Sequence, residues 1–214
     1  MSPSPWEGKI TDARERRQVV SSSREFTGRV WHVRRDIVDL GSGGDPVTRE
    51  VVEHTGAVGV LALDDRERVL LLRQYRHAVG AMLWEAPAGL LDVAGEDPFE
   101  AAKRELWEES GYRAGRWNVL VDFYNSPGGS TEAFRCYLAR DLELAPEDDR
   151  HAGEDEEQDM PQAWVPLDEA VALVLEGHLH NPTSVSGILA AAAARARGWD
   201  TLRPADAPWE WRHT

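Results

Sequence analysis

The stretch over residues 89–112, GLLDVAGEDPFEAAKRELWEESGY, constrains the fold of this chain more than any other part of the sequence. Asp97 is a typical N-cap residue, Pro98 suits the first helical position, and Glu100 follows three residues after the cap in a capping-box pattern. Gly111 then provides a typical C-terminal stop. These local signals predict a helix from Asp97 to Gly111.

The predicted helix has two faces of opposite character. Its buried face is expected to consist of apolar side chains at helical spacing, namely Phe99, Ala102 and Leu106. Glu105, Glu108 and Glu109 crowd one turn, and like charges at i,i+4 destabilise a helix by roughly 0.2–0.5 kcal/mol per pair. Lys103 and Arg104 are adjacent, but sequence neighbours point to different faces, so we expect them not to neutralise the whole cluster. A hard divalent cation could do so, and spacing alone leaves metal binding and ion pairing as alternatives.

The composition limits the class of protein. The chain has 214 residues, 42% of them hydrophobic, which is enough for an independent core. Its formal net charge of −14 disfavours non-specific binding to nucleic acid. No apolar run approaches the roughly 18 residues of a membrane span, and the N-terminal residues lack the apolar region of a signal peptide. We therefore expect no membrane association and a cytoplasmic protein, in which the single cysteine, Cys136, is a small buried hydrophobe.

Turn and strand signals divide the chain into three parts. Over residues 1–54 we expect a loosely held arm, followed from about Phe26 by a β-hairpin annex of FTGRVWHVRRDIVDL and PVTREVVEHTG around GSGGD. Strands and helices then interleave over residues 55–196 in one α/β (α+β) domain, and residues 197–214 form a tryptophan-bearing tail. The strands expected in the domain are 58–63, 69–75, 117–124, 133–139 and AWVPL, and two further helices are expected over 167–178 and 184–198.

The stretch described first resembles the signature of the Nudix hydrolase family: Gly, five residues, Glu, seven residues, then Arg-Glu-aliphatic-any-Glu-Glu-any-Gly-aliphatic. Every required position from Glu96 to Gly111 matches. Six residues rather than five separate Gly89 from Glu96, and Tyr112 stands at an aliphatic position. The resemblance covers about residues 55–195. It implies a Nudix-type α/β/α sandwich with a mixed sheet, and divalent-metal-dependent hydrolysis of nucleoside diphosphates linked to another moiety.

The resemblance also implies a role for each residue of the motif. Glu105 and Glu109 would be the principal ligands of Mg²⁺ (or Mn²⁺), Glu108 would assist, and the backbone carbonyl of Ala88 would complete the metal shell. Arg104 would orient the glutamates by ion pairing, without touching substrate. The ion would neutralise a pyrophosphate and lower the pKa of an attacking water.

Features outside the motif resemble the ADP-ribose pyrophosphatase branch of the family. By the match to QYRHAVGAMLWEAPAGLLD, Arg76 would contact the pyrophosphate and Glu85 the substrate or its surroundings, although Arg76 could also be an ordinary surface cation. Pro127, in NSPGGSTE, lies at the branch's distance beyond the motif. The remaining residues that this match assigns to substrate binding are Leu90, Ser126 and Glu132.

The segment TREVVEH resembles the N-terminal segment of the same branch. An arginine there reaches substrate, often across a dimer with exchanged N-terminal domains, and Arg49 is its counterpart in this chain, with His54 as a weaker candidate. A single hairpin is only marginally stable alone and needs a partner surface. The resemblance therefore implies a homodimer formed through residues 1–54.

In this branch the catalytic base is a glutamate on a loop beyond the motif. Residues 142–159 carry nine acids against one arginine, and their EEQDM nominates Glu157, with Glu156 and Glu154 as close rivals. The implied reaction is attack of water on a phosphorus of ADP-ribose, giving AMP and ribose 5-phosphate. Two alternatives stay open: a pyrophosphatase for NADH, nucleotide sugars or dinucleoside polyphosphates, and a non-catalytic module that senses a nucleotide.

Overall fold

The computed structural model describes residues 7–41, 43–146 and 160–212. The chain divides into two compact units, Met1–Val52 and Glu53–Thr214. Each unit is described below by itself.

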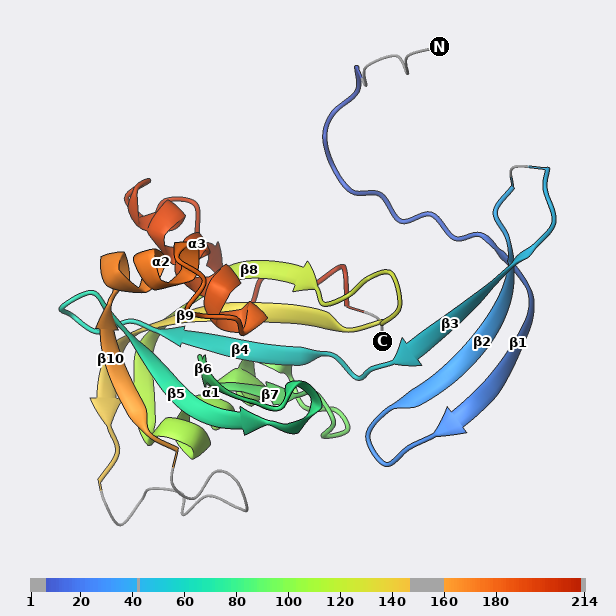
Figure 1. The fold of residues 1–214 in the computed structure, drawn as a ribbon. Coiled ribbons are helices and arrows are strands. Elements are labelled where there is room, and N and C mark those ends of the chain that lie inside the picture. Colours follow the sequence, from blue (N-terminus) through green and yellow to red (C-terminus); the bar gives the residue numbers. More distant parts are fainter. Residues whose placement is uncertain (1–6, 42, 147–159, 213–214) are drawn as a thin grey trace. The chain divides into compact units, whose positions relative to one another are not determined.

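The N-terminal unit is built on a three-stranded sheet in the order β1-β2-β3 (Figure 1). Its strands are β1 (Gln18–Thr27), β2 (His32–Asp39) and β3 (Val47–Glu53). Strands β2 and β3 fall within the two segments of the predicted hairpin and are neighbours in this sheet, whereas β1, which pairs with β2 in antiparallel register, was not predicted. The predicted first strand is broken at Gly28, whose N–H donates to the carbonyl oxygen of Trp31 at 2.9 Å. Strand β1 is exposed along its length and rich in serine. Its sequence therefore does not show the alternation of apolar and polar residues by which a strand is recognised.

The second unit contains two sheets, of five strands in the order β11-β8-β9-β4-β7 and of three strands in the order β10-β5-β6. The larger sheet is mixed, because β4 runs parallel to β9 whereas β8 runs antiparallel to β9. The strands are β4 (Ala57–Ala62), β5 (Arg68–Arg76), β6 (Ala81–Glu85), β7 (Ala88–Leu90), β8 (Tyr112–Tyr124), β9 (Ala133–Leu144), β10 (Gln162–Pro166) and β11 (Arg203–Pro204). The helices are α1 (Pro98–Ser110), α2 (Leu167–Leu175) and α3 (Pro182–Arg195), with a 3-10 turn at His77–Val79.

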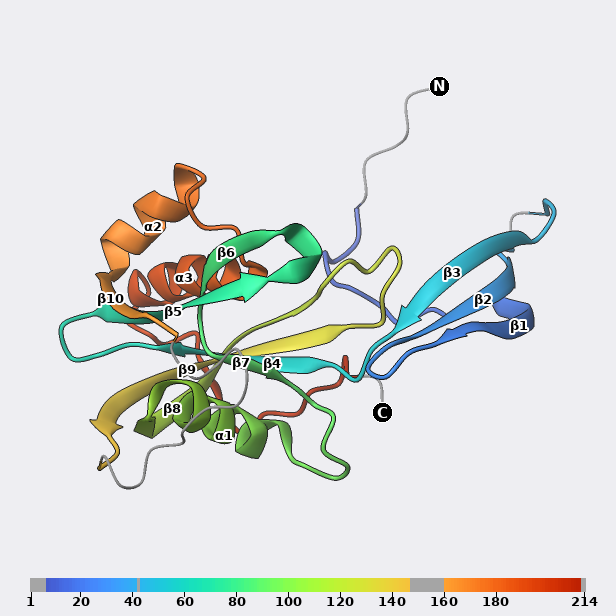
Figure 2. The ribbon, with the colours of Figure 1, turned by 60° about the horizontal axis from the view of Figure 1, so that its bottom comes forward.

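Helices cover both faces of the sheets, with α1 on one side and α2 and α3 on the other (Figure 2). Alternate residues of β4 point to opposite faces, so Leu61 packs in one cluster with Ile188 of α3, whereas Val60 packs in another with Leu106 of α1. Cys136 is fully buried in the first cluster, as predicted. This arrangement confirms the predicted α/β/α sandwich. Among the described residues, no helix has both the length and the apolar character needed to cross a membrane.

Helix α1 confirms the strongest local prediction. The Asp97 carboxylate caps the helix by accepting from the N–H of Phe99 at 2.8 Å, and Pro98 occupies its first turn. Gly111 ends the helix in the left-handed conformation, with φ of 75°. Glu100 forms an ion pair with Lys103 at 2.6 Å, which lies on the exposed side of the first turn.

The C-terminal tail packs against the rest of the second unit. Strand β11 pairs with β8, and the buried guanidinium of Arg135 donates to the carbonyl oxygen of Ala207 at 2.7 Å. The same guanidinium lies over the ring of Trp209, 4.9 Å from its centroid, and pairs bidentately with Asp122. One buried cation therefore fastens the tail to the sheet through hydrogen bonds as well as an aromatic contact.

Candidate active site

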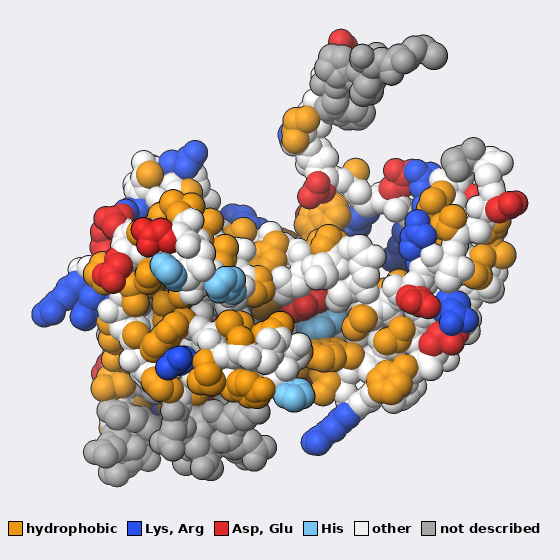
Figure 3. Space-filling model, viewed as in Figure 1, with side chains coloured by type: hydrophobic (Ala, Val, Ile, Leu, Met, Phe, Trp, Pro, Cys, Tyr) orange, Lys and Arg blue, Asp and Glu red, His pale blue; other side chains and the backbone are white. Residues whose placement is uncertain are grey.

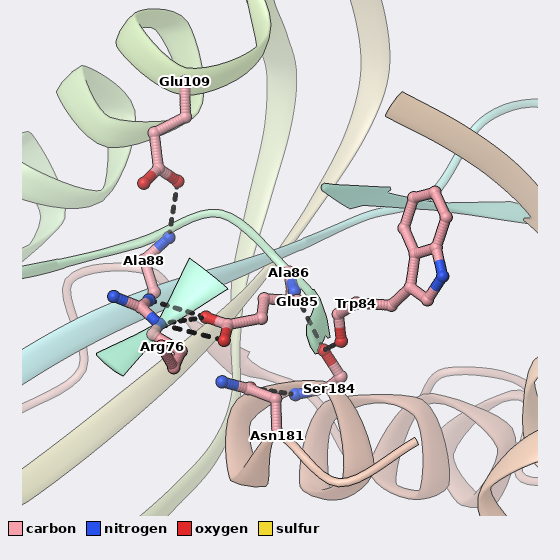
Figure 4. A network of polar contacts seen from close by, with 8 residues as sticks. All are labelled: Arg76, Trp84, Glu85, Ala86, Ala88, Glu109, Asn181 and Ser184. Carbon is pink, nitrogen blue, oxygen red and sulfur yellow. Dashed lines mark hydrogen bonds and ion pairs between the residues drawn. The ribbon is translucent and has the colours of Figure 1, made fainter. Parts of the chain in front are cut away.

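The C-terminal half of α1 presents its carboxylates to strand β7. Glu105 and Glu109 are one helical turn apart, so they share a face. The Glu109 Oε2 accepts from the N–H of Ala88 at 2.9 Å (Figure 4). Gly89 approaches Glu105 so closely that an added Cβ would lie 2.0 Å from the Glu105 Oε1. The glycine of the motif thus leaves the space in which the Glu105 carboxylate lies.

Arg104 connects three of the acids around α1. Its Nε and Nη2 donate to the two carboxylate oxygens of Glu96 at 2.9 and 3.0 Å. Its Nη1 donates to Glu105 Oε1 at 2.7 Å and to Glu108 Oε2 at 2.8 Å. The hydrogen bonds from Arg104 lower the pKa of Glu96, and the acidic neighbours, with the bond to Glu96 first, raise the pKa of Arg104. The guanidinium is therefore permanently charged at the centre of an acidic cluster.

These contacts correct one step of the sequence reasoning. Adjacent side chains on a helix were expected to diverge, yet Arg104 pairs with Glu105, because its long side chain can turn its planar fork back along the helix. Lys103 does lie away from the cluster, beside Glu100 and over the ring of Phe99. Arg104 thus offsets the repulsion between two of the three crowded glutamates.

Hard oxygen donors gather at this face of α1. The described residues contain no group of three or more His, Cys, Asp or Glu side chains already arranged around a metal position. Mg²⁺, however, needs only one or two carboxylates beside waters and phosphate oxygens. Glu105 and Glu109 meet that requirement, since both face β7 and the Glu105 carboxylate lies in the space that the missing Cβ of Gly89 leaves. The donor set therefore fits a hard divalent cation.

A second charged pair lies on the other side of Ala88 (Figure 4). Arg76, at the end of β5, donates from Nε and Nη2 to both carboxylate oxygens of Glu85, with a shortest distance of 2.6 Å. The side chain of Glu85 is only 4% exposed, whereas that of Arg76 is 43% exposed. The buried carboxylate therefore fixes the orientation of a guanidinium that still reaches solvent.

His54 and Glu132 form a smaller polar cluster at the start of β4. The His54 Nδ1 accepts from the N–H of Gly56 at 3.0 Å, and Nε2 lies 3.9 Å from the Glu132 carboxylate, which also accepts from Asn125. Burial lowers the pKa of His54, and the charge of Glu132 opposes this only in part. His54 is therefore neutral near pH 7, with its proton on Nε2. Ser126 follows Asn125 in the left-handed region, with φ of 51°.

For the remaining predicted residues, the structure gives the position relative to the candidate site only in part. Leu90 is in β7 and packs, half buried, against the core cluster that includes α3. Arg49 is in the N-terminal unit, where its Nη1 donates to the carbonyl oxygen of Thr48 at 2.8 Å, so its approach to the site stays a prediction. The candidate bases Glu157, Glu156 and Glu154 lie outside the described residues.

Sequence reasoning missed two polar residues that support the site. Asn125 lies next to Ser126 in NSPGG, but no spacing rule connects its amide with Glu132. Ser184 of α3 contacts the connection between β6 and β7, and its hydroxyl accepts from the N–H of Ala86 at 2.9 Å. Only the fold brings these groups together, because 98 positions separate Ser184 from Ala86.

The fold and the motif together define a Nudix protein. The family model described as NUDIX domain matches residues 53–184, and the chain belongs to this family. A similar relative is the ADP-ribose pyrophosphatase of Mycobacterium tuberculosis, 45% identical over 192 residues that cover 90% of each chain. The methanol dehydrogenase activator of Bacillus methanolicus is 33% identical, over 80% of this chain and 90% of its own. A solved ADP compounds hydrolase shares the fold with a TM-score of 0.72 at 22% identity, over 88% of this chain and 99% of its own.

Proposed function

We propose that this protein hydrolyses the pyrophosphate of ADP-ribose to AMP and ribose 5-phosphate with the help of Mg²⁺ (or Mn²⁺). The observation that carries the proposal is the arrangement around Ala88, where the α1 carboxylates lie on one side and the Arg76–Glu85 pair on the other. This arrangement supports the proposal, because carboxylates suited to a hard cation would lie beside a guanidinium suited to phosphate oxygens. The ADP-ribose pyrophosphatase of Mycobacterium tuberculosis, similar over nearly the whole chain, supports this choice of substrate.

The chain's own residues would divide the work as follows. Glu105 and Glu109, with Glu108 and the carbonyl oxygen of Ala88, would hold the ion, which supplies charge neutralisation and a water of lowered pKa. Arg76, whose orientation is fixed by its pair with Glu85, would bind the pyrophosphate. Arg104 would keep the Glu105 and Glu108 carboxylates in place by its hydrogen bonds. His54 and Glu132, with Ser126 and Leu90, are proposed to contact the sugar side of the substrate.

Glu157 is proposed to take the proton from the attacking water. The described ends of its segment support this choice, because both contact the C-terminal end of α1, close to Glu109. The N–H of Ala145 donates to the carbonyl oxygen of Gly111 at 2.9 Å, and Gln162 Nε2 donates to that of Ser110 at 3.3 Å. Sixteen residues, 146–161, separate Ala145 from Gln162, and Glu157 is one of them.

The test of substrate and metal site is a steady-state panel with Mg²⁺. Wild-type protein is assayed on ADP-ribose, NADH, a nucleotide sugar and a dinucleoside polyphosphate, with AMP and ribose 5-phosphate measured by chromatography. ADP-ribose is expected to have the highest kcat/KM, and Glu109→Gln to lose at least about 100-fold. A higher kcat/KM on another substrate would overturn the substrate proposal, and full activity of Glu109→Gln would overturn the metal site.

The base is tested by three matched variants, Glu154→Gln, Glu156→Gln and Glu157→Gln. The Glu157 variant is expected to lose roughly 10²–10⁴-fold in kcat, the usual contribution of a general base, while its KM changes little. The other two variants serve as controls for loss of one negative charge from the same segment. A larger loss of kcat in either control would move the assignment to that residue.

We also propose a homodimer formed through the N-terminal unit. Figure 3 shows hydrophobic side chains at the surface of this unit. Those on and beside its sheet that are about half exposed include Val19, Val20, Phe26, Val30 and Trp31. Such an uncovered sheet is a typical surface for pairing with a second copy. Light scattering should give twice the chain mass of 23.9 kDa, and a monomer would contradict the proposal.

A mixing experiment tests whether Arg49 acts across that dimer. Arg49→Ala and Glu109→Gln are each expected to be inactive as homodimers. If each site combines Arg49 of one protomer with Glu109 of the other, subunit exchange should restore about a quarter of the sites. Activity that stays at the sum of the two variants, although mixed dimers form, would place Arg49 in its own protomer's site or outside it.

A further inference from the structure

A buried serine on α3 holds the connection between strands β6 and β7. Ser184 is fully buried, and its hydroxyl accepts from the N–H of Ala86 at 2.9 Å and donates to the carbonyl oxygen of Trp84 at 3.3 Å. Figure 4 shows the serine directly beside this connection. The two hydrogen bonds hold the backbone at Trp84 and Ala86, on either side of Glu85, the residue that orients Arg76.

The connection is short and crosses between sheets. Strand β6 ends at Glu85 in the smaller sheet, and β7 begins at Ala88 in the larger one. Ala88 is fixed at one end by its hydrogen bond to Glu109, and Pro87 is fixed by the hydrogen bond from Val60 to its carbonyl oxygen at 2.8 Å. Ala86, which precedes Pro87, is held by the hydroxyl of Ser184 from α3.

The support behind Ser184 is itself rigid. Asn181 caps α3, and its side-chain oxygen accepts from the N–H of Ser184 at 3.1 Å. Thr183 packs so closely on β4 that a Cβ added to Gly59 would lie 2.5 Å from the Thr183 methyl group. The first turn of α3 therefore cannot shift toward the connection, or away from it, without losing tight contacts.

We propose that Ser184 is a positioning residue, which sets the distance between the Arg76 guanidinium and the α1 carboxylates by fixing the backbone around Glu85. The inference rests on the proposed function. Removing the hydroxyl leaves the N–H of Ala86 without its acceptor at a residue that is only 2% exposed. A buried N–H that loses its acceptor drives the backbone to move toward another partner. Glu85 moves with that backbone, and Arg76 follows Glu85.

The test compares Ser184→Ala with Ile188→Val, which removes a buried methyl group from the same helix but leaves the hydrogen bonds of Ser184 intact. Ser184→Ala is expected to raise the KM for ADP-ribose, and the Kd for ADP-ribose measured by calorimetry in EDTA, by about tenfold. Ile188→Val should lower the free energy of unfolding by about 0.5–1.5 kcal/mol but leave KM and Kd within about twofold of wild type. Equal kinetic effects of the two variants would overturn the proposal.

A double-mutant cycle tests the route through Arg76. In an Arg76→Ala background, Ser184→Ala should add less than about twofold to KM, because the group that it positions is already gone. A full tenfold addition would show that Ser184 acts independently of Arg76 and would overturn the proposal. If Ser184→Ala does not fold, Ser184→Cys keeps the volume while weakening both bonds, and its KM should rise in the same direction; an unchanged KM refutes the role.

The two levels of proposal fail in different ways. If wild-type protein does not hydrolyse ADP-ribose, the proposed function is wrong. If wild type hydrolyses ADP-ribose and Ser184→Ala behaves like Ile188→Val, only the positioning role is wrong.

Discussion

Replacing Gly89 with alanine should inactivate the site while the fold survives. The new Cβ would lie 2.0 Å from Glu105 Oε1 and 2.1 Å from its Cδ, whereas ordinary contact begins at 3.4 Å. The carboxylate must therefore retreat by about 1.4 Å, far more than the tolerance of a Mg²⁺ site with ligands at roughly 2.0–2.1 Å. Because a misplacement of about 1 Å can cost around 100-fold in rate, we expect kcat/KM to fall at least 100-fold. Accommodating the methyl group should cost about 1–3 kcal/mol of unfolding free energy.

The assay measures kcat/KM for ADP-ribose and the free energy of unfolding in urea, with Gly95→Ala as the matched control. Gly95 has φ of 81°, and an added Cβ there meets no heavy atom within 4 Å. The control should therefore lose about 1–2 kcal/mol of stability through backbone strain and keep kcat/KM within about twofold. If Gly89→Ala keeps kcat/KM within about threefold of wild type, the close approach of Gly89 to Glu105 has no role in the reaction.

Three further outcomes follow from the charges of the described residues. The hydrogen bonds from Arg104 lower the pKa of Glu96 below its usual 4.5, so the ion pair stabilises the fold fully above that pH and loses this effect as the pH falls through the lowered value. The difference in unfolding free energy between wild type and Glu96→Gln, measured in urea, should therefore shrink below about pH 4.5, and a constant difference would contradict this. Arg135→Met removes the buried partner of the Asp122 carboxylate, which keeps its ion pair with Arg203, and should cost about 1.5–3 kcal/mol, with faster proteolysis of the tail; an intact tail would contradict it. Burial raises the pKa of the Cys136 thiol to about 12, so Ellman's reagent should label it at pH 8 only after unfolding, and rapid labelling would refute the buried placement.

The helix that carries the site could be predicted because its signals are local. Asp97 caps and Gly111 stops the helix within its own turns, so no distant contact is needed to define it. The i,i+4 spacing likewise places Glu105 and Glu109 on one face before any tertiary structure is known. Their common contact with β7 requires the fold, however, because the N–H that binds Glu109 belongs to a strand 21 positions earlier.

Elements whose stability depends on distant partners could not be predicted in the same way. The strands expected over 58–63 and 69–75 correspond to β4 and β5, yet the two lie in different sheets, and the β-pairing described between these segments is the isolated bridge from Leu63 to Val69. Strand β1 was missed because its backbone pairing with β2 needs no apolar pattern. Ser184 looks like an ordinary helix residue in the sequence, since its function depends on a backbone N–H that lies 98 positions away.

The spacing of Glu105, Glu108 and Glu109 on one turn left metal binding and ion pairing as alternative ways to offset their repulsion. In the structure, ion pairing offsets part of it. Arg104 already bonds two of these carboxylates, and Glu109 is held by a backbone N–H. A lysine could not take this place, because its single ammonium cannot present a planar fork to Glu96 while also reaching two further acids. The chain itself therefore orders the carboxylates on this face of α1. The free energy of binding an ion is then not reduced by the entropy lost in ordering its ligands.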